Sequence, residues 1–273
     1  MTNYIPAGDI GTLLPYVDSS EFSADIYRRA GLFVLRRAIP DAVIRRWQAE
    51  WSAFYTSELA GDRRIDPYAP VVVHEAAPPA LRDIDRSPYL LNVLERLYPD
   101  LGLYIQRFAI KDRKSRGAVF LHHDVCYDLG WPEKTSAFVA LSIANRENGG
   151  LILYPATHAL GYLGDVGELN RALLDPEWPA ICPAVEPGDV ILMHECTWHA
   201  SEPHIRGPDR VLVQITYQPA SDPTSAELLR GEWRTRYRLA AVSDARFFTR
   251  SRASRLRELQ AEVDRLKAAT PGA

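Results

Sequence analysis

The sequence predicts a mainly β protein with flanking helices, and two features of its hydrophobic pattern predict this. From Leu101 onward, short runs rich in β-branched and aromatic residues are separated by turn signals, such as NGG at 148–150 and EPG at 186–188. Before Leu101, apolar residues recur mainly at the spacing of an amphipathic helix. Many short strands with frequent turns favour a β-sandwich or a barrel, against which the helices would pack.

The expected strands can be placed from these apolar runs. The first is GLFVLRR at 31–37. The β-type region adds LYIQRFAIK (103–111), GAVFLHH (117–123), SAFVALSI (136–143), GLILYP (150–155), DVILMH (189–194) and VLVQITYQP (211–219). One longer interruption separates the last two strands from the others, and we expect it to include a small helix near Val166–Leu173.

Two helices are expected before the β-type region. The clearer one spans Asp41–Ala60, where apolar and aromatic residues form one face and Asp41 can cap the N-terminus. The other spans Ser87–Tyr98, with Ser87 as the cap and Pro88 at the first helical position. We expect both apolar faces to pack against the core.

We expect a single domain over 1–273, with helical support and a lid in 1–100, the barrel in 101–220 and a helical segment in 221–273. Residues 61–86 contain four prolines and little periodicity, which predicts a functional lid or a poorly ordered segment. In the last segment, an apolar seam of about two heptads is too short to indicate a stable coiled coil. The chain is therefore expected to be a monomer or a homodimer.

The composition is that of an ordinary globular protein. Hydrophobic residues make up 47% and charged residues 25%, and the formal net charge is −3, so neither nucleic acid nor an anionic membrane is expected as a partner. Three cysteines without CxxC spacing favour free thiols in a reducing compartment. With no signal peptide or membrane-spanning run visible, the expected location is the cytoplasm.

Three residues have the pattern of a metal site. His122 and Asp124 lie two positions apart on a predicted strand, so both side chains point to one face, whereas His123 points to the other. His199 follows a second predicted strand, 77 positions after His122. His-x-Asp alone is a weak signal, and its order and context add the specificity. Two imidazoles and one carboxylate leave coordination positions open, an arrangement typical of non-haem Fe(II) oxygenases.

A cation follows the second histidine. Arg210 begins the last predicted strand, 11 positions after His199, and its guanidinium can grip a carboxylate at two points. Ser201, two residues after His199, could donate a hydroxyl hydrogen bond to the same carboxylate. If Arg210 points inward, the alternate residues of its strand, including Gln214, point inward as well.

These elements resemble, in residues and in order, the phytanoyl-CoA dioxygenase family of Fe(II)/2-oxoglutarate oxygenases. The resemblance covers roughly Leu103 to Gln218. FLHHDVCYD (120–128) resembles the family's His-x-Asp element, and ENGGLILYPATH (147–158) resembles its Asn-Gly and Pro-Gly-Ser-His segment. PGDVILMHECTWHAS (187–201) resembles the stretch that carries the third ligand. The resemblance implies a double-stranded β-helix, which is a cupin-like jelly-roll barrel, with helices packed on it.

The resemblance also implies roles for individual residues. His122, Asp124 and His199 would bind Fe(II), while Arg210 and Ser201 would hold the distal carboxylate of 2-oxoglutarate. Dioxygen would be the second cosubstrate. The expected products of the cosubstrates are succinate and carbon dioxide, and the oxidising power would be directed at an unactivated C–H bond.

Other residues bear on the cosubstrate and substrate. Gln106, on the strand before His-x-Asp, is an expected further contact of 2-oxoglutarate. The family's Pro-Gly-Ser-His is Pro-Ala-Thr-His at 155–158, and His204 replaces a usual asparagine, so substrate identity does not follow from the resemblance. The expected substrate rim is Val125–Lys134, which includes Tyr127 and Trp131, together with the lid at 61–86.

The expected function is hydroxylation of an aliphatic C–H bond in a small organic metabolite, such as an intermediate of secondary metabolism. Asp124 argues against halogenation, because halogenating relatives replace this carboxylate with a small residue. The same iron centre could instead perform desaturation, oxidative cyclisation or epimerisation. A noncatalytic jelly-roll module that binds a ligand or a protein partner is the alternative from another class.

Overall fold

The computed structural model describes residues 8–56, 71–73, 79–112, 116–126, 128, 130–161, 169–222, 227–228 and 261. Two β-sheets organise these residues. The large sheet has the strand order β1-β2-β8-β6-β10-β4-β11, with β3 also paired to β4, and the small sheet has the order β5-β9-β7. Apart from the parallel pair β1-β2, the paired strands are antiparallel.

The strands agree closely with the apolar runs of the sequence. The large sheet consists of β1 (Asp18–Ser19), β2 (Leu32–Leu35), β3 (Val71–Val73), β4 (Leu101–Lys111), β6 (Thr135–Ala140), β8 (Val190–His194), β10 (Arg210–Pro219) and β11 (Glu227–Leu228). The small sheet consists of β5 (Val119–His122), β7 (Leu151–Leu153) and β9 (His199–Ser201). Because neighbouring strands come from distant parts of the chain, the topology is that of a jelly roll. The predicted double-stranded β-helix is confirmed.

The helices are short and precede most of the strands. The α-helices are α1 (Ala24–Ala30), α2 (Asp41–Phe54), α3 (Pro79–Arg82) and α4 (Pro88–Leu94). Turns of 3-10 helix are η1 (Ile10–Thr12), η2 (Leu14–Tyr16), η5 (Asp83–Arg86), η6 (Asp124–Cys126), η7 (Thr157–Leu160) and η8 (Arg171–Leu173). Within the described ranges, no helix is long and apolar enough to cross a membrane.

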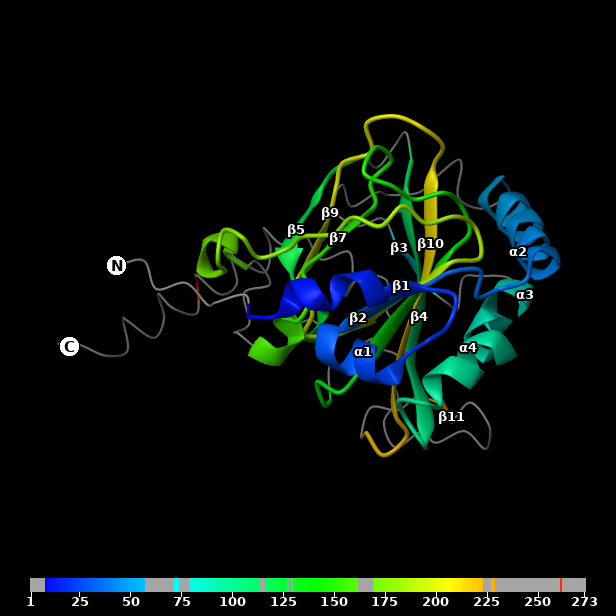
Figure 1. Ribbon diagram of the computed structural model, residues 1–273. Coiled ribbons are helices and arrows are strands. Elements are labelled where there is room, and N and C mark those ends of the chain that lie inside the picture. The colour runs from blue at the N-terminus through cyan, green and yellow to red at the C-terminus, as the bar shows by residue number, and fades with distance from the viewer. Residues whose placement is uncertain are drawn as a thin grey trace.

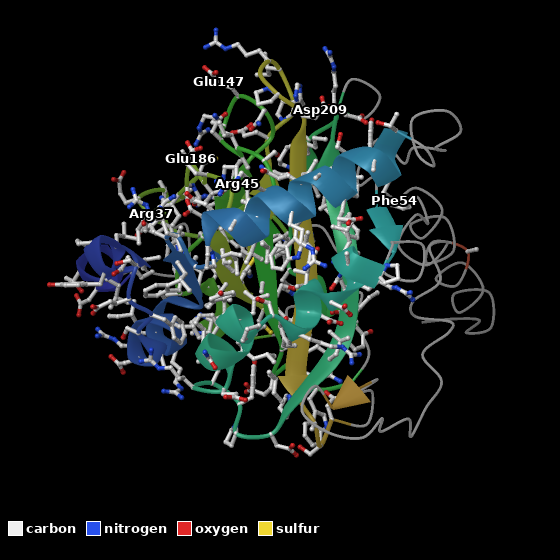
Figure 2. The ribbon with its side chains drawn as sticks, turned by 90° about the vertical axis from the view of Figure 1, so that its right-hand side faces the viewer. Arg37, Arg45, Phe54, Glu147, Glu186 and Asp209 are labelled. Carbon is white, nitrogen blue, oxygen red and sulfur yellow. The ribbon has the colours of Figure 1, made fainter. Side chains whose placement is uncertain are left out.

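The outer face of the large sheet packs against α2 and α4, whereas β5, β7 and β9 lie on its other side (Figure 1). Figure 2 shows α2, which carries Arg45 and Phe54, lying across the strands of the large sheet. Trp51 of α2 stacks on Phe108 of β4, with ring centroids 4.9 Å apart. The outward residues of β10 join this core, as the alternation of its sequence predicted: Val211, Val213, Ile215 and Tyr217.

The space between the two sheets is apolar at one part and polar at another. Phe138 and Leu212 of the large sheet belong to the same buried cluster as Leu151 and Leu153 of the small sheet. Further along β10, buried Gln214 donates to Ser136 of β6 and to Asp124 in the turn after β5. This polar part of the interior contains the metal-type residues.

The predicted helix boundaries need two corrections. Helix α2 begins at Asp41, but its N-cap is Pro40 and no side chain caps it, so Asp41 contributes a negative charge to the first turn instead. The second helix has Ser87 at the N-cap and Pro88 in its first turn, as predicted, but it ends at Leu94 rather than Tyr98. The chain continues there in turns that are closed by bonds such as Tyr98 N–H to Leu94 O.

The segment 61–86 is more regular than expected where it is described. It contributes β3 to the large sheet, followed by α3 and η5, so the expected lack of regular structure is wrong for these parts, whereas a role as a lid stays a prediction. Residues 57–70 and 74–78 lie outside the described residues, as do 162–168 of the small predicted helix. The predicted C-terminal helical segment is described only at 227–228 and 261. The single-domain organisation stays a prediction.

Candidate metal centre

Two strands of the small sheet and the turn after one of them bring together the three metal-type residues. His122 ends β5 and is in register with His199, which begins β9, while Asp124 begins η6. The Nε2 atoms of His122 and His199 lie 3.3 Å and 3.5 Å from Oδ1 of Asp124. All three side chains are buried, and among the described residues they form the one group with the spacing of metal ligands. The structure thus gathers the predicted triad.

Backbone carbonyls orient both imidazoles. Nδ1 of His122 lies 2.8 Å from Phe120 O, and Nδ1 of His199 lies 3.0 Å from Thr197 O. Because a carbonyl can only accept, each Nδ1 carries the hydrogen, and the Nε2 lone pairs are directed at the site. This is the tautomer in which a histidine binds a metal through Nε2.

The electrostatics of the triad suit a cation. Burial and the neighbouring His199 lower the pKa of His122, so this imidazole is neutral and available as a ligand. Burial acts to raise the pKa of Asp124, but His199, His122 and Arg107 outweigh it and hold that pKa well below its usual value. Two imidazoles and one carboxylate are the donor set that Fe(II) accepts in non-haem oxygenases.

Arg210 and Ser201 lie in the same interior. Arg210 begins β10 and is buried, and its Nη1 donates to Gly149 O at 2.7 Å. Ser201 shares the face of His199, because the two are separated by one residue on β9. Arg210 Nε and Ser201 Oγ are buried and have no hydrogen-bond partner among the described residues. Buried polar atoms of this kind are costly unless a ligand pairs with them, and a carboxylate would satisfy both.

A second buried cation lies beside Arg210, and sequence reasoning missed it. Lys111 ends β4 in register with Arg210, and its Nζ donates to Glu202 O. Burial and the charge of Arg210 lower the pKa of Lys111 to about 7. A Cβ on Gly149, at φ 91°, would lie 2.4 Å from the Lys111 Cδ, so glycine is needed for the lysine to fit. Only the register of β4 on β10 reveals this pair, although Lys111 is one of only four lysines in the chain.

Among the described residues, the side chains of these two adjacent buried cations donate only to backbone carbonyls, which makes them a suitable site for an anion. Figure 2 places Glu147 and Asp209 near the same end of the molecule. The loop around Glu147 and the loop before β10 meet there through the bond from Ile205 N–H to Glu147 O. The carbonyls of Gly149 and Glu202, which accept from Arg210 and Lys111, belong to these two loops. A dicarboxylate bound to the triad at one end would place its other carboxylate in this kind of environment.

Gln106 does not belong to this interior. It is in register with Ile215, a residue of the outer face, and its Nε2 donates to Leu81 O of α3 at 2.9 Å. The inward residues of β4 include Arg107, which lies beside Asp124, and Lys111, which lies beside Arg210. The expected contact of Gln106 with 2-oxoglutarate is therefore wrong, because the pleat of β4 turns its side chain toward the helices.

The expected substrate rim is described only in part. Trp131 is exposed, in agreement with a rim position, whereas Tyr127 lies outside the described residues. Lys134, at the end of the rim, is instead buried and pairs with Asp222 at 3.0 Å. This ion pair ties the rim to the segment that follows β10, so Lys134 has a structural role.

The sequence matches the family model "Phytanoyl-CoA dioxygenase (PhyH)" over residues 27–210, which is more than half of the chain. The chain belongs to the phytanoyl-CoA dioxygenase family. Among curated proteins, none matches it. The match begins in α1 and ends at Arg210, and therefore spans the triad, Lys111 and Ser201.

Solved structures of the same fold include two enzymes of nogalamycin biosynthesis. The epimerase SnoN in complex with Fe3+, alpha ketoglutarate and nogalamycin RO is 20% identical, with a TM-score of 0.63 over 78% of this chain and 89% of SnoN. The carbocyclase SnoK from nogalamycin biosynthesis is 19% identical, with a TM-score of 0.60 over 75% of this chain and 87% of SnoK. HygX from Streptomyces hygroscopicus, with nickel, 2-oxoglutarate and hygromycin B bound, is 17% identical, with a TM-score of 0.57 over 73% and 88%.

The PhyH-family chain is an iron- and 2-oxoglutarate-dependent enzyme, and its own residues fit both groups. The triad supplies the donors that Fe(II) prefers, and the unpaired atoms of Arg210 and Ser201 fit a buried carboxylate. Iron bound in this way activates dioxygen at the expense of 2-oxoglutarate. A noncatalytic jelly-roll module is set aside, because the chain belongs to an enzyme family and retains the complete ligand set.

We expect Lys111 to make 2-oxoglutarate binding dependent on pH. Its pKa near 7 means that it is charged below neutrality and largely neutral above it, while both carboxylates of the ligand stay ionised. A bound dianion favours the charged lysine, so binding takes up a proton, and affinity for 2-oxoglutarate should fall by up to about tenfold per pH unit as pH rises from about 7 to 8.5.

The Lys111→Met variant should bind 2-oxoglutarate more weakly than the wild type near pH 6 and show a flatter pH profile. Calorimetric titration of the metal-loaded protein at several pH values measures both effects, and an equal slope in the variant would contradict the role of Lys111.

Proposed function

We propose that this enzyme hydroxylates an aliphatic C–H bond of a small organic metabolite. The observation that carries the proposal is the complete triad, with Asp124 in place beside His122 and His199 and a buried cation pair in the same interior. In a halogenating site, a halide would occupy the position that Asp124 occupies here. The presence of this carboxylate therefore supports oxygen insertion rather than halogenation.

The residues of the chain would divide the work. His122, Asp124 and His199 hold the iron, while Arg210, Ser201 and Lys111 hold the distal carboxylate of 2-oxoglutarate. With both of its ends held by these residues, the cosubstrate would be restricted to one orientation. The triad is itself buried, which limits the access of water and would protect the oxidising step from side reactions.

The other outcomes of the same iron centre are a second candidate. The similar structures SnoN and SnoK are an epimerase and a carbocyclase, so this fold supports reactions that insert no oxygen. The structures of SnoN and HygX contain the small molecules nogalamycin RO and hygromycin B, which supports a small-molecule substrate for this chain as well. We infer a metabolite of this size class rather than a macromolecule.

The test has two stages. Anaerobic addition of Fe(II) and 2-oxoglutarate to the purified protein should produce a visible metal-to-ligand charge-transfer band. A panel of secondary metabolites is then screened for succinate release above the uncoupled background, and the products are analysed by mass spectrometry. Hydroxylation adds one oxygen atom, desaturation or cyclisation removes two hydrogen atoms, and epimerisation leaves the mass unchanged. Absence of both the band and succinate would overturn the proposal.

A further inference from the structure

The two oxygens of Asp124 have different surroundings. Oδ1 faces the Nε2 atoms of both histidines, at 3.3 Å and 3.5 Å. Oδ2 points the other way, accepts a hydrogen bond from Gln214 Nε2 at 3.0 Å, and lies 3.8 Å from Arg107 Nη2. One oxygen is therefore directed at the metal-type side chains, and the other is held by the large sheet.

Arg107 fixes the orientation of the Gln214 amide. The two residues are in register on β4 and β10, and Arg107 Nε donates to Gln214 Oε1 at 2.8 Å. With Oε1 occupied by this donor, the NH2 group must face Asp124. The same NH2 group also donates to Ser136 Oγ at 3.1 Å, and Ser136 Oγ donates to Glu195 Oε1 at 2.7 Å. In each of these hydrogen bonds, the donor and the acceptor are therefore defined.

The bonds are buried and connect the large sheet to the turn that follows β5. Gln214, Ser136 and Glu195 are at most 5% exposed, so solvent does not compete for their hydrogen bonds. Asp124 is also held through its backbone, because its N–H donates to Glu195 O at 3.0 Å. Asp124 follows β5 of the small sheet in the sequence. Its Oδ2 is nevertheless held by residues of the large sheet, so that Oδ1 is the oxygen that faces the two histidines.

We propose that Gln214 and Arg107 are positioning residues that present only Oδ1 of Asp124 to the metal. A carboxylate that is free to turn could offer both oxygens to the cation and occupy a position that the cosubstrates need. The bond from Gln214 removes this freedom, and Arg107 prevents the amide from flipping. The inference rests on the proposed function, because it requires that the triad binds a metal ion.

The test compares metal binding by metal-free variants, with Co(II) as the probe in an anaerobic titration near pH 8. In Gln214→Glu, the donor that faces Asp124 becomes a carboxylate oxygen, so Oδ2 is repelled. We expect affinity to fall about 10- to 100-fold, the usual range for loss of a partner that orients a metal ligand. Charge alone predicts the opposite, because an added carboxylate near the site would tighten binding of a cation. We also expect the visible Co(II) spectrum to change, because the ligand oxygens are no longer held.

Two further variants make the result specific. Gln214→Met removes the donor without adding charge and should also weaken Co(II) binding, and it is the variant of choice if Gln214→Glu does not fold. Thr216→Val is the matched control, because Thr216 is buried on the same strand as Gln214 and the substitution removes its bond to Ser136 of 2.9 Å. Since Gln214, and not Thr216, donates to Asp124, this variant should keep the affinity of the wild type for Co(II). Thermal unfolding of each metal-free variant monitors folding.

Wild-type affinity and spectrum in both Gln214 variants would overturn the inference, as would an equal loss in Thr216→Val. A wild-type protein that binds neither Co(II) nor Fe(II) would instead contradict the proposed function. The two failures are therefore distinguishable in one set of titrations.

Discussion

Replacing His199 by alanine is expected to abolish the charge-transfer band and to lower succinate formation by more than about 100-fold, since loss of a mere orienting partner already costs 10- to 100-fold. His199 supplies one of only two imidazoles, and its Nε2 lies 3.5 Å from Asp124 Oδ1. Without it, the remaining donors are those of His122 and Asp124, which bind a divalent cation weakly. Metal content after anaerobic loading and gel filtration measures the loss directly.

A second readout of the same variant is stability. Because an ion that binds only the folded state raises the unfolding temperature, Fe(II) or Co(II) should stabilise the wild type and leave His199→Ala unchanged. His158→Gln is the matched control, because His158 bonds to Arg28 O and contacts none of the triad. Retained metal binding in His199→Ala, or an equal loss in His158→Gln, would contradict the assignment of the triad.

Replacing Arg210 by leucine is expected to weaken 2-oxoglutarate binding from about 30-fold to several-thousand-fold, corresponding to the roughly 2–5 kcal/mol that loss of a buried charge partner costs. Its guanidinium is buried and retains an unpaired Nε, so solvent cannot replace the lost bond. Burial lowers the pKa of Arg210 only to about 10, and the group is therefore charged at neutral pH. The charge-transfer band, titrated with 2-oxoglutarate, reports this affinity.

Cosubstrate analogues distinguish a binding role from general damage. A 2-oxo monoacid that lacks the distal carboxylate should bind the wild type much more weakly than 2-oxoglutarate binds it. In Arg210→Leu, the affinities of the monoacid and of 2-oxoglutarate should be similar. Iron affinity should be unchanged, because Arg210 contacts Gly149 rather than the triad. A variant that still prefers 2-oxoglutarate as strongly as the wild type would show that the distal carboxylate is held elsewhere.

Much of the fold follows from local sequence. Alternating apolar residues place the strands, and the pleat of β10 was predicted in both directions: Arg210 and Gln214 point inward, while Val211 and Ile215 pack under the helices. The helix prediction was less accurate at its ends, since Ser87 and Pro88 mark the start of α4 while no comparable signal marks its end at Leu94.

The same local reasoning failed for Gln106. Its residue type suited a contact with 2-oxoglutarate, but one position along an extended strand reverses the face of the sheet. In the structure, the residue of β4 that points toward the metal-type side chains is Arg107 rather than Gln106, and it lies beside Asp124 and Gln214. Without the register of β4 on β10, the sequence offers no means of choosing between these two neighbours.

The strand pattern, the spacing of His122, Asp124 and His199, and the position of Arg210 at the head of a strand could be predicted without coordinates, because these depend on residues close together in the chain or on a family motif. The contact of Lys111 with Arg210, and the bonds that link Arg107 to Gln214 and Gln214 to Asp124, became apparent from the folded structure alone. Both arrangements join β4 to β10, about a hundred residues apart, and hydrogen-bond register between distant strands leaves no local signal.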